Sequence, residues 1–141
     1  MRIVVAVLFS YWLLGICAAI AGVDDSRSGA TLYAEHCASC HGANLEGQPN
    51  WRSPNSDGTL PAPPHDESGH TWHHGDLLLF KYVKLGGAAA VKELGVSSFR
   101  SGMPSFAGVL SDREIRDVLN FIKSHWSERA RAHQKRVSET E

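Results

Sequence analysis

Hydrophobic positions recur at helical spacing in three segments of the chain, and the clearest lies at residues 111–126. Ser111 and Glu114 stand three residues apart ahead of the apolar positions, which is the pattern of a capping box. The apolar positions are Ile115, Val118, Leu119, Ile122 and Trp126. Because residues three and four apart share one face of an α-helix, this segment is predicted to be an amphipathic helix packed on the core.

The other two helices are predicted at residues 28–40 and 76–85. In the first, Ala30, Tyr33, Ala34 and Cys37 share one face, and Cys40 and His41 follow on it. The second is an apolar run with Asp76 as its expected N-cap and a pair of glycines at 86–87 as its stop. Residues 88–94 are compatible with a further short helix.

Long irregular segments separate these helices. Residues 42–75 hold five of the six prolines, and a structureless loop of this length is unusual in a compact domain unless it wraps something. Three short helices bury little surface unless a large apolar group fills the centre, which points to a cofactor. Residues 127–141 carry mixed charge and few apolar side chains, so they are predicted to be a frayed helical extension and a disordered polar tail.

Length and charge narrow the class of protein. A chain of 141 residues suits one domain with a modest core. Lys and Arg together number 14 against 15 Asp and Glu, a net charge of −1 without a basic cluster, so a nucleic-acid partner is not expected.

The N-terminus has the pattern of an export signal. Arg2 is followed by an uncharged run, residues 3–23, and Ala19 and Ala21 form a small-x-small cleavage pattern. Residues 1–21 are therefore predicted to be a signal peptide, with an uncleaved membrane anchor as the alternative. Either outcome places the protein in the periplasm or at the periplasmic face of the membrane. Cys17 belongs to the signal, which leaves two cysteines in the mature chain.

Those two cysteines form the motif Cys37-Ala38-Ser39-Cys40-His41. A Cys-x-x-Cys-His sequence is the attachment signature of c-type haem, in which each thiol forms a thioether with a haem vinyl group and the histidine binds the iron. A zinc site needs a second pair of ligands, and a thioredoxin-like disulfide needs a preceding strand, whereas this motif closes a helix. Covalent attachment of a single haem c is the favoured interpretation.

A second axial ligand for the iron is expected from the downstream sequence. Met103 stands between a glycine and a proline, in an extended and constrained loop suited to presenting a thioether. The alternative ligands are the histidines of the segment 65–74, namely His65, His70, His73 and His74. The same cluster raises the alternative of a second metal such as copper.

Taken together, residues 28–126 resemble a class I cytochrome c, a small exported monohaem protein. The resemblance rests on the attachment motif, the downstream Gly-Met-Pro and the C-terminal amphipathic helix, in that order. It implies an all-α cytochrome c fold in which the first and last helices cross around the haem, with long Gly/Pro-rich loops. It also implies that Cys37 and Cys40 carry the thioethers and that His41 and Met103 bind the iron.

The resemblance implies further contacts. Tyr33 and Leu119 are expected near the helix crossing, with Trp126 at the end of the last helix. A backbone carbonyl among the prolines at 61–64 is expected to orient the proximal imidazole. The segment 65–74 departs from a minimal member of the family, and Trp72 and His73 are hypothesised to donate hydrogen bonds to the haem propionates.

The function expected from these features is electron transfer, not catalysis, with transient contacts to redox partner proteins. Membrane contact is expected only through an uncleaved N-terminal segment. The enzyme alternative is a haem protein with an open or displaceable sixth site, which would be peroxidase-like or gas-binding. The binding-protein alternative is a copper module formed by the histidines of 65–74.

Overall fold

The computed structural model describes residues 25–141, with side chains from residue 29 onward, so the expected signal at 1–21 and Cys17 lie outside the described residues. The elements in chain order are α1 (Asp25–His36), α2 (Ala38–His41), the 3₁₀ turn η1 (Thr71–His73), α3 (Asp76–Leu85), α4 (Gly87–Glu93), α5 (Asp112–Ser124) and α6 (Glu128–Ser138). Within this part of the chain there is no strand, and the all-α prediction is confirmed. None of these helices is long and apolar enough to cross a membrane.

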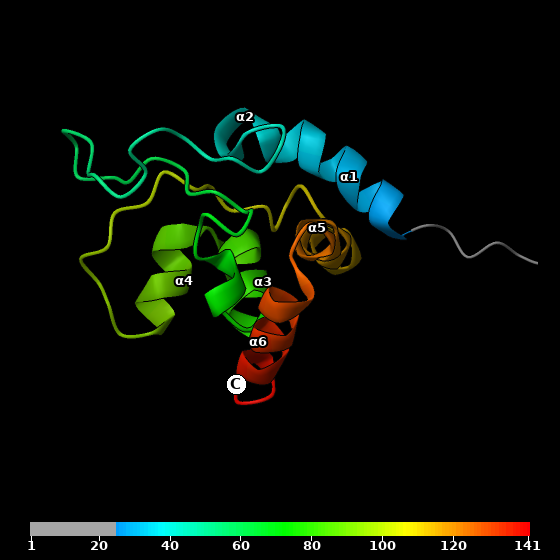
Figure 1. The fold of residues 1–141 in the computed structure, drawn as a ribbon. Coiled ribbons are helices and arrows are strands. Elements are labelled where there is room, and N and C mark those ends of the chain that lie inside the picture. Colours follow the sequence, from blue (N-terminus) through cyan, green and yellow to red (C-terminus); the bar gives the residue numbers. More distant parts are fainter. Residues whose placement is uncertain (1–24) are drawn as a thin grey trace, which may run out of the picture.

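The contact between α1 and α5 is the largest between any two helices, and Figure 1 shows the two helices against each other. The helices meet at a glycine: a Cβ on Gly29 would lie 2.1 Å from the carbonyl oxygen of Asp117. Only a residue without a side chain permits this approach. One turn later Tyr33 is 1% exposed, and its ring centroid lies 5.3 Å from that of Phe121.

The predicted start of α5 is confirmed in detail. The Ser111 hydroxyl accepts a hydrogen bond from the Glu114 backbone N–H, and the Glu114 carboxylate accepts one from the Ser111 backbone N–H. The apolar stripe of this helix forms the centre of one hydrophobic core. Its buried members are Tyr33, Leu45, Leu79, Val83, Leu110, Ile115, Val118, Leu119, Ile122, Trp126 and Ala130.

Helix α3 lies where the sequence predicts it, but its N-cap is different. The N-cap is Gly75, and Asp76 is the first helical residue. Its first backbone N–H groups donate to side chains of the C-terminal segment: that of Asp76 to Ser138 Oγ (3.0 Å) and that of Leu77 to a Glu141 carboxylate oxygen (2.8 Å). The cap therefore comes from residues 62 and 64 positions away in the sequence.

The C-terminal segment corrects a prediction. The helical extension predicted within residues 127–141 is present as α6, but it is capped rather than frayed and packs against η1, and Glu141 after it binds the start of α3 instead of belonging to a disordered tail. Ser127 is its N-cap, and Ala130 and Gln134 are 2% and 4% exposed. Composition misled here because α6 buries only one short apolar side chain and is held mainly by hydrogen bonds.

These bonds tie residues 126–141 to the segment 65–78. Successive bonds join successive positions of the two segments, so the segments are paired in the same chain direction. Trp126 binds the carbonyl oxygen of His65 at the start, and Gln134 Nε2 donates to the carbonyl oxygen of His74 (3.3 Å) and to Asp76 Oδ1 (2.6 Å) in the middle. The Glu141 carboxylate completes the series at the start of α3. We call residues 126–141 the C-terminal clasp. Figure 1 shows α6 following the end of α5.

Replacing Gly29 with alanine tests the helix crossing. The new Cβ forces α1 and α5 apart, and the loss of packing exceeds the gain in helix propensity, so a net loss of about 1–3 kcal/mol is expected in the free energy of unfolding. Denaturant titration of the holoprotein measures it. Gly108→Ala is the control, because nothing lies within 4 Å of its Cβ position. Equal stability of the two variants would contradict the crossing.

Replacing Gln134 with alanine tests the C-terminal clasp. The change leaves the His74 carbonyl without its donor, and a loss of about 1–2 kcal/mol is expected in the free energy of unfolding. Lys135→Ala is the matched control, since its exposed side chain forms a long ion pair with Glu139, at 4.0 Å. If both variants unfold at the same denaturant concentration as the unmodified protein, α6 does not hold the segment 65–78 as described.

Candidate haem site

The attachment motif forms a tight helical turn at the end of α1. The helix breaks at Cys37, whose N–H donates to the Tyr33 carbonyl oxygen (2.9 Å), and the chain turns again so that the His41 N–H donates to the Cys37 carbonyl oxygen (2.9 Å). Both thiols are free, with Cys37 half-buried and Cys40 exposed. Burial, with a smaller contribution from Cys40, raises the pKa of the Cys37 thiol to about 11. The turn therefore presents a half-buried, protonated sulfur at Cys37 and an exposed sulfur at Cys40.

His41 is held at its inner nitrogen. Its Nδ1 lies 2.8 Å from the carbonyl oxygen of Pro63, and the imidazole is 8% exposed. A carbonyl accepts only, so Nδ1 carries the proton and Nε2 keeps its lone pair. Burial lowers the pKa of His41 against the opposing effect of the Pro63 bond, which favours the neutral ring. The predicted contact between this imidazole and a carbonyl of the segment 61–64 is confirmed.

The chain on either side of His41 is tied to its surroundings. The Tyr33 hydroxyl donates to the carbonyl oxygen of Gly42 (2.9 Å), and the Gly47 N–H donates to the carbonyl oxygen of His41 (2.7 Å). The Gln48 N–H donates to the carbonyl oxygen of Ala62, next to Pro63 (2.9 Å). These bonds fix the distance between the motif and the proline segment.

His65 lies against His41, a position that the sequence did not indicate. The two rings stack with centroids 4.0 Å apart and planes 19° apart. Burial, and then the neighbouring His41 and His70, lower the pKa of His65 well below its usual value. Rings stacked face to face cannot bind one iron from opposite sides, so this arrangement argues against His65 as the second axial ligand.

The remaining histidines of the segment pack against different neighbours. His70 stacks on Trp51 (5.2 Å between centroids) with its edge towards His74, whereas the exposed His73 lies between Trp72 and His133 of α6. Across residues 25–141 no three His, Cys, Asp or Glu side chains come together as a metal site. The geometry thus gives the copper hypothesis no support.

The hypothesised donors to the propionates have protein partners nearby. The indole N–H of Trp72 points to the carbonyl oxygen of Glu67 at 3.4 Å, and the ring of Trp72 stacks obliquely on His73, with centroids 3.7 Å apart. The Trp72 side chain is half-buried against the core, while His73 is exposed. The two rings thus lie between η1 and α6.

Met103 lies half-buried against the core, in a loop whose backbone is fixed. Its N–H donates to Ser101 Oγ (3.1 Å), and its carbonyl oxygen accepts from the Gly87 N–H (3.2 Å). A Cβ on Gly86, where φ is +82°, would lie 2.9 Å from the backbone of Pro104. The glycine pair at 86–87, predicted to end α3, therefore also contacts the loop that carries Met103.

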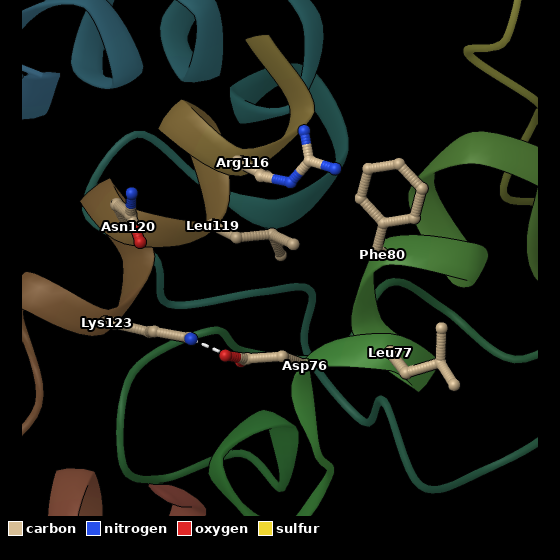
Figure 2. Close-up of a pocket in the computed structure, with 7 residues that line it drawn as sticks. All are labelled: Asp76, Leu77, Phe80, Arg116, Leu119, Asn120 and Lys123. Carbon is tan, nitrogen blue, oxygen red and sulfur yellow. Dashed lines mark hydrogen bonds and ion pairs between the residues drawn. The ribbon is translucent and has the colours of Figure 1, made fainter. Parts of the chain in front are cut away.

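A separate pocket of about 380 Å³ lies between α3 and α5, and Figure 2 shows its lining. The ion pair of Lys123 with Asp76 closes one side, and the Arg116 guanidinium carbon lies 5.1 Å from the centre of the Phe80 ring on the other. Leu119 forms part of the wall between them. None of the predicted haem-binding residues lines this pocket.

Comparison with known proteins identifies the class. The family model described as cytochrome c matches residues 26–126, and the chain belongs to this family. The gluconate 2-dehydrogenase cytochrome c subunit of Pantoea cypripedii is 29% identical over 117 residues, an alignment that covers 77% of this chain and 22% of that protein. This chain thus spans about a fifth of the relative's length. No solved structure matches it significantly. The protein is a c-type cytochrome that binds haem c and functions in electron transfer.

The donor set of the site fits covalently bound haem c. Two free thiols are separated by two residues in one helical turn, and the adjacent imidazole keeps an unprotonated Nε2 because its Nδ1–H donates to the Pro63 carbonyl oxygen. Neutral imidazole is the form that binds iron. The orienting bond to a backbone carbonyl is a common partner of metal-binding histidines.

Replacing Trp126 with phenylalanine tests the support behind the site. Trp126 is 2% exposed, and its indole N–H donates to the carbonyl oxygen of His65 at 2.7 Å. Phenylalanine keeps most of the packing but leaves that carbonyl without its donor, so a loss of about 1–3 kcal/mol is expected in the free energy of unfolding. Trp72→Phe is the matched control, because its indole bond is long, at 3.4 Å. Equal losses in the two variants would contradict this role of Trp126.

Proposed function

We propose that this protein is an exported single-haem electron carrier in which Cys37 and Cys40 hold the haem and His41 and Met103 are the axial ligands. The observation that carries the proposal is the bond from His41 Nδ1 to the Pro63 carbonyl oxygen at 2.8 Å. It leaves Nε2 as the free donor of a buried, neutral imidazole, directly next to the Cys-x-x-Cys turn.

The loop around Met103 supports its role as the second ligand. The Met103 backbone is tied on both sides, and the Phe106 N–H donates to the carbonyl oxygen of Val83 at the end of α3 (3.1 Å). Met103 and Phe106 both pack against the hydrophobic core. A thioether held on such a fixed loop suits an iron that keeps the same ligands in both oxidation states, and Met/His ligation raises the reduction potential.

The haem iron supplies one-electron chemistry by cycling between its ferric and ferrous states. The contribution of this chain is to keep the ligand geometry fixed during that change. Pro63 holds the His41 ring, Tyr33 ties the end of the motif to α1, and the core excludes water behind the site. A rigid environment limits the reorganisation that accompanies each transfer.

The partner we propose is a dehydrogenase that passes electrons to this protein through a transient contact. Support comes from the relative, which is named as the cytochrome c subunit of gluconate 2-dehydrogenase. Small, weak interfaces are usual for redox encounters. The signal pattern at residues 1–21 supports export, which places the encounter in the periplasm or at its membrane face.

Replacing Met103 with alanine tests the axial ligation. If the thioether binds iron, the oxidised variant loses the near-infrared sulfur-to-iron absorption band, and its reduction potential falls, because a ligand that favours the ferrous state is gone. Visible and near-infrared spectra with a redox titration measure both. His73→Ala, an exposed position, is the control and should keep the band.

An unchanged near-infrared band in Met103→Ala would contradict the proposed ligand. A band missing already from the unmodified protein would also contradict it, and would favour the open or displaceable sixth site of a peroxidase-like or gas-binding haem protein. Binding of carbon monoxide or peroxide by the unmodified protein would then identify which class applies.

A further inference from the structure

The side chain of His65 is held on several sides at once. Its Nδ1 lies 3.0 Å from Thr71 Oγ1, and the edge of the Tyr33 ring approaches it with centroids 6.2 Å apart at 72°. Its flat face lies on the ring of His41. A side chain fixed by a hydrogen bond, an aromatic edge and a stacked ring has little freedom to rotate.

The backbone of His65 is fixed as well. Its N–H donates to the carbonyl oxygen of Leu45 (2.8 Å), and its carbonyl oxygen accepts from the Trp126 indole N–H (2.7 Å). Leu45 is 2% exposed and Trp126 is 2% exposed, so both partners belong to the core. The backbone position of His65 is therefore set by Trp126, just after α5, and by the loop that follows the motif.

The hydrogen bonds also determine which nitrogen of His65 carries the proton. The hydroxyl of Thr71 donates to the carbonyl oxygen of Pro64 (3.3 Å), so its oxygen is left to accept from His65. His65 is thus protonated at Nδ1. The chain from His65 through Thr71 to Pro64 ends one residue from Pro63, whose carbonyl holds His41. Residues 63–65 therefore supply both contacts to the His41 imidazole, the hydrogen bond to the Pro63 carbonyl oxygen and the stacked ring of His65.

These two contacts restrain different motions of the His41 ring. The bond to Pro63 fixes the direction of Nδ1 within the ring plane, but a single hydrogen bond permits the plane to tilt about it. A flat ring stacked at 4.0 Å and 19° restrains that tilt. An aliphatic side chain of similar size would fill the space without presenting a plane.

We propose that His65 is a positioning residue, which sets the plane of the His41 imidazole through the stack and thereby the orientation of the axial ligand. This inference rests on the proposed role of His41 as the proximal ligand. The alternative is a purely structural role, in which His65 only supplies the hydrogen bond to Thr71. The two roles use different parts of the side chain, so they can be separated by substitution.

Two substitutions separate the roles. His65→Phe keeps a flat ring against His41 but loses the donor to Thr71. His65→Asn keeps an amide donor at the place of Nδ1 but loses the ring. The plane of an axial imidazole governs the magnetic anisotropy of a low-spin ferric haem. The spread of the paramagnetically shifted haem methyl proton resonances, together with the g-values in electron paramagnetic resonance, therefore reports on that plane in each oxidised holoprotein.

The proposal predicts that His65→Asn shifts the haem methyl resonances and changes their order, whereas His65→Phe stays close to the unmodified protein. The same two substitutions at His125, whose Nδ1 lies 2.9 Å from the carbonyl oxygen of Phe121 and whose ring contacts the Phe121 ring, are the controls and should leave the resonances unchanged. The proposal is overturned if His65→Asn keeps the original pattern while His65→Phe alone loses thermal stability, which is the result of the structural role.

A second measurement applies if either variant fails to accumulate. In the reduced, diamagnetic form of the unmodified holoprotein, nuclear Overhauser contacts between the ring protons of His65 and His41 are expected, and their absence overturns the stack. Failure of the function proposed above has a different signature. In that case the unmodified protein itself lacks covalent haem or a low-spin ferric signal.

Discussion

The hydrogen bond from His41 to the carbonyl oxygen of Pro63 is the constraint on which the rest of the site depends. It joins the attachment motif to a segment 22 residues further along, and in doing so it closes the long loop between them. It also sets the protonation of the imidazole, because Nδ1 must carry the proton and Nε2 keeps its lone pair. The stacked His65, the Gly47 N–H and the Tyr33 hydroxyl all act around this one bond.

The rest of the fold keeps that arrangement in place. The close approach of α1 and α5 at Gly29 fixes the helix that ends in the motif. The C-terminal clasp, which lies beyond the region matched to the cytochrome c family apart from Trp126, holds the segment that follows the prolines. The segment 65–74 thus links the side of the site that contains His41 to α6. Its histidine rings pack in pairs with aromatic neighbours.

Much of this could be predicted from the sequence, because it rests on local signals. The capping box of Ser111 and Glu114, the apolar stripe of α5 and the Cys-x-x-Cys-His motif depend on spacing alone. The C-terminal clasp could not be predicted, since α6 is polar and is held by single hydrogen bonds to distant backbone groups. The stack of His65 on His41 was also missed, because a half-buried histidine and an exposed histidine look alike in a polar loop.

We propose above all that the turn from Cys37 to His41 holds one covalent haem. The most direct test is the pyridine haemochrome spectrum of the unmodified protein, produced with its own N-terminus in a host that attaches haem c, after extraction of non-covalent haem with acidified solvent. Our account predicts that the haem stays with the protein and that its reduced α-band lies at the position typical of two thioether bonds. Haem that is extracted, or a protein without haem, would contradict it.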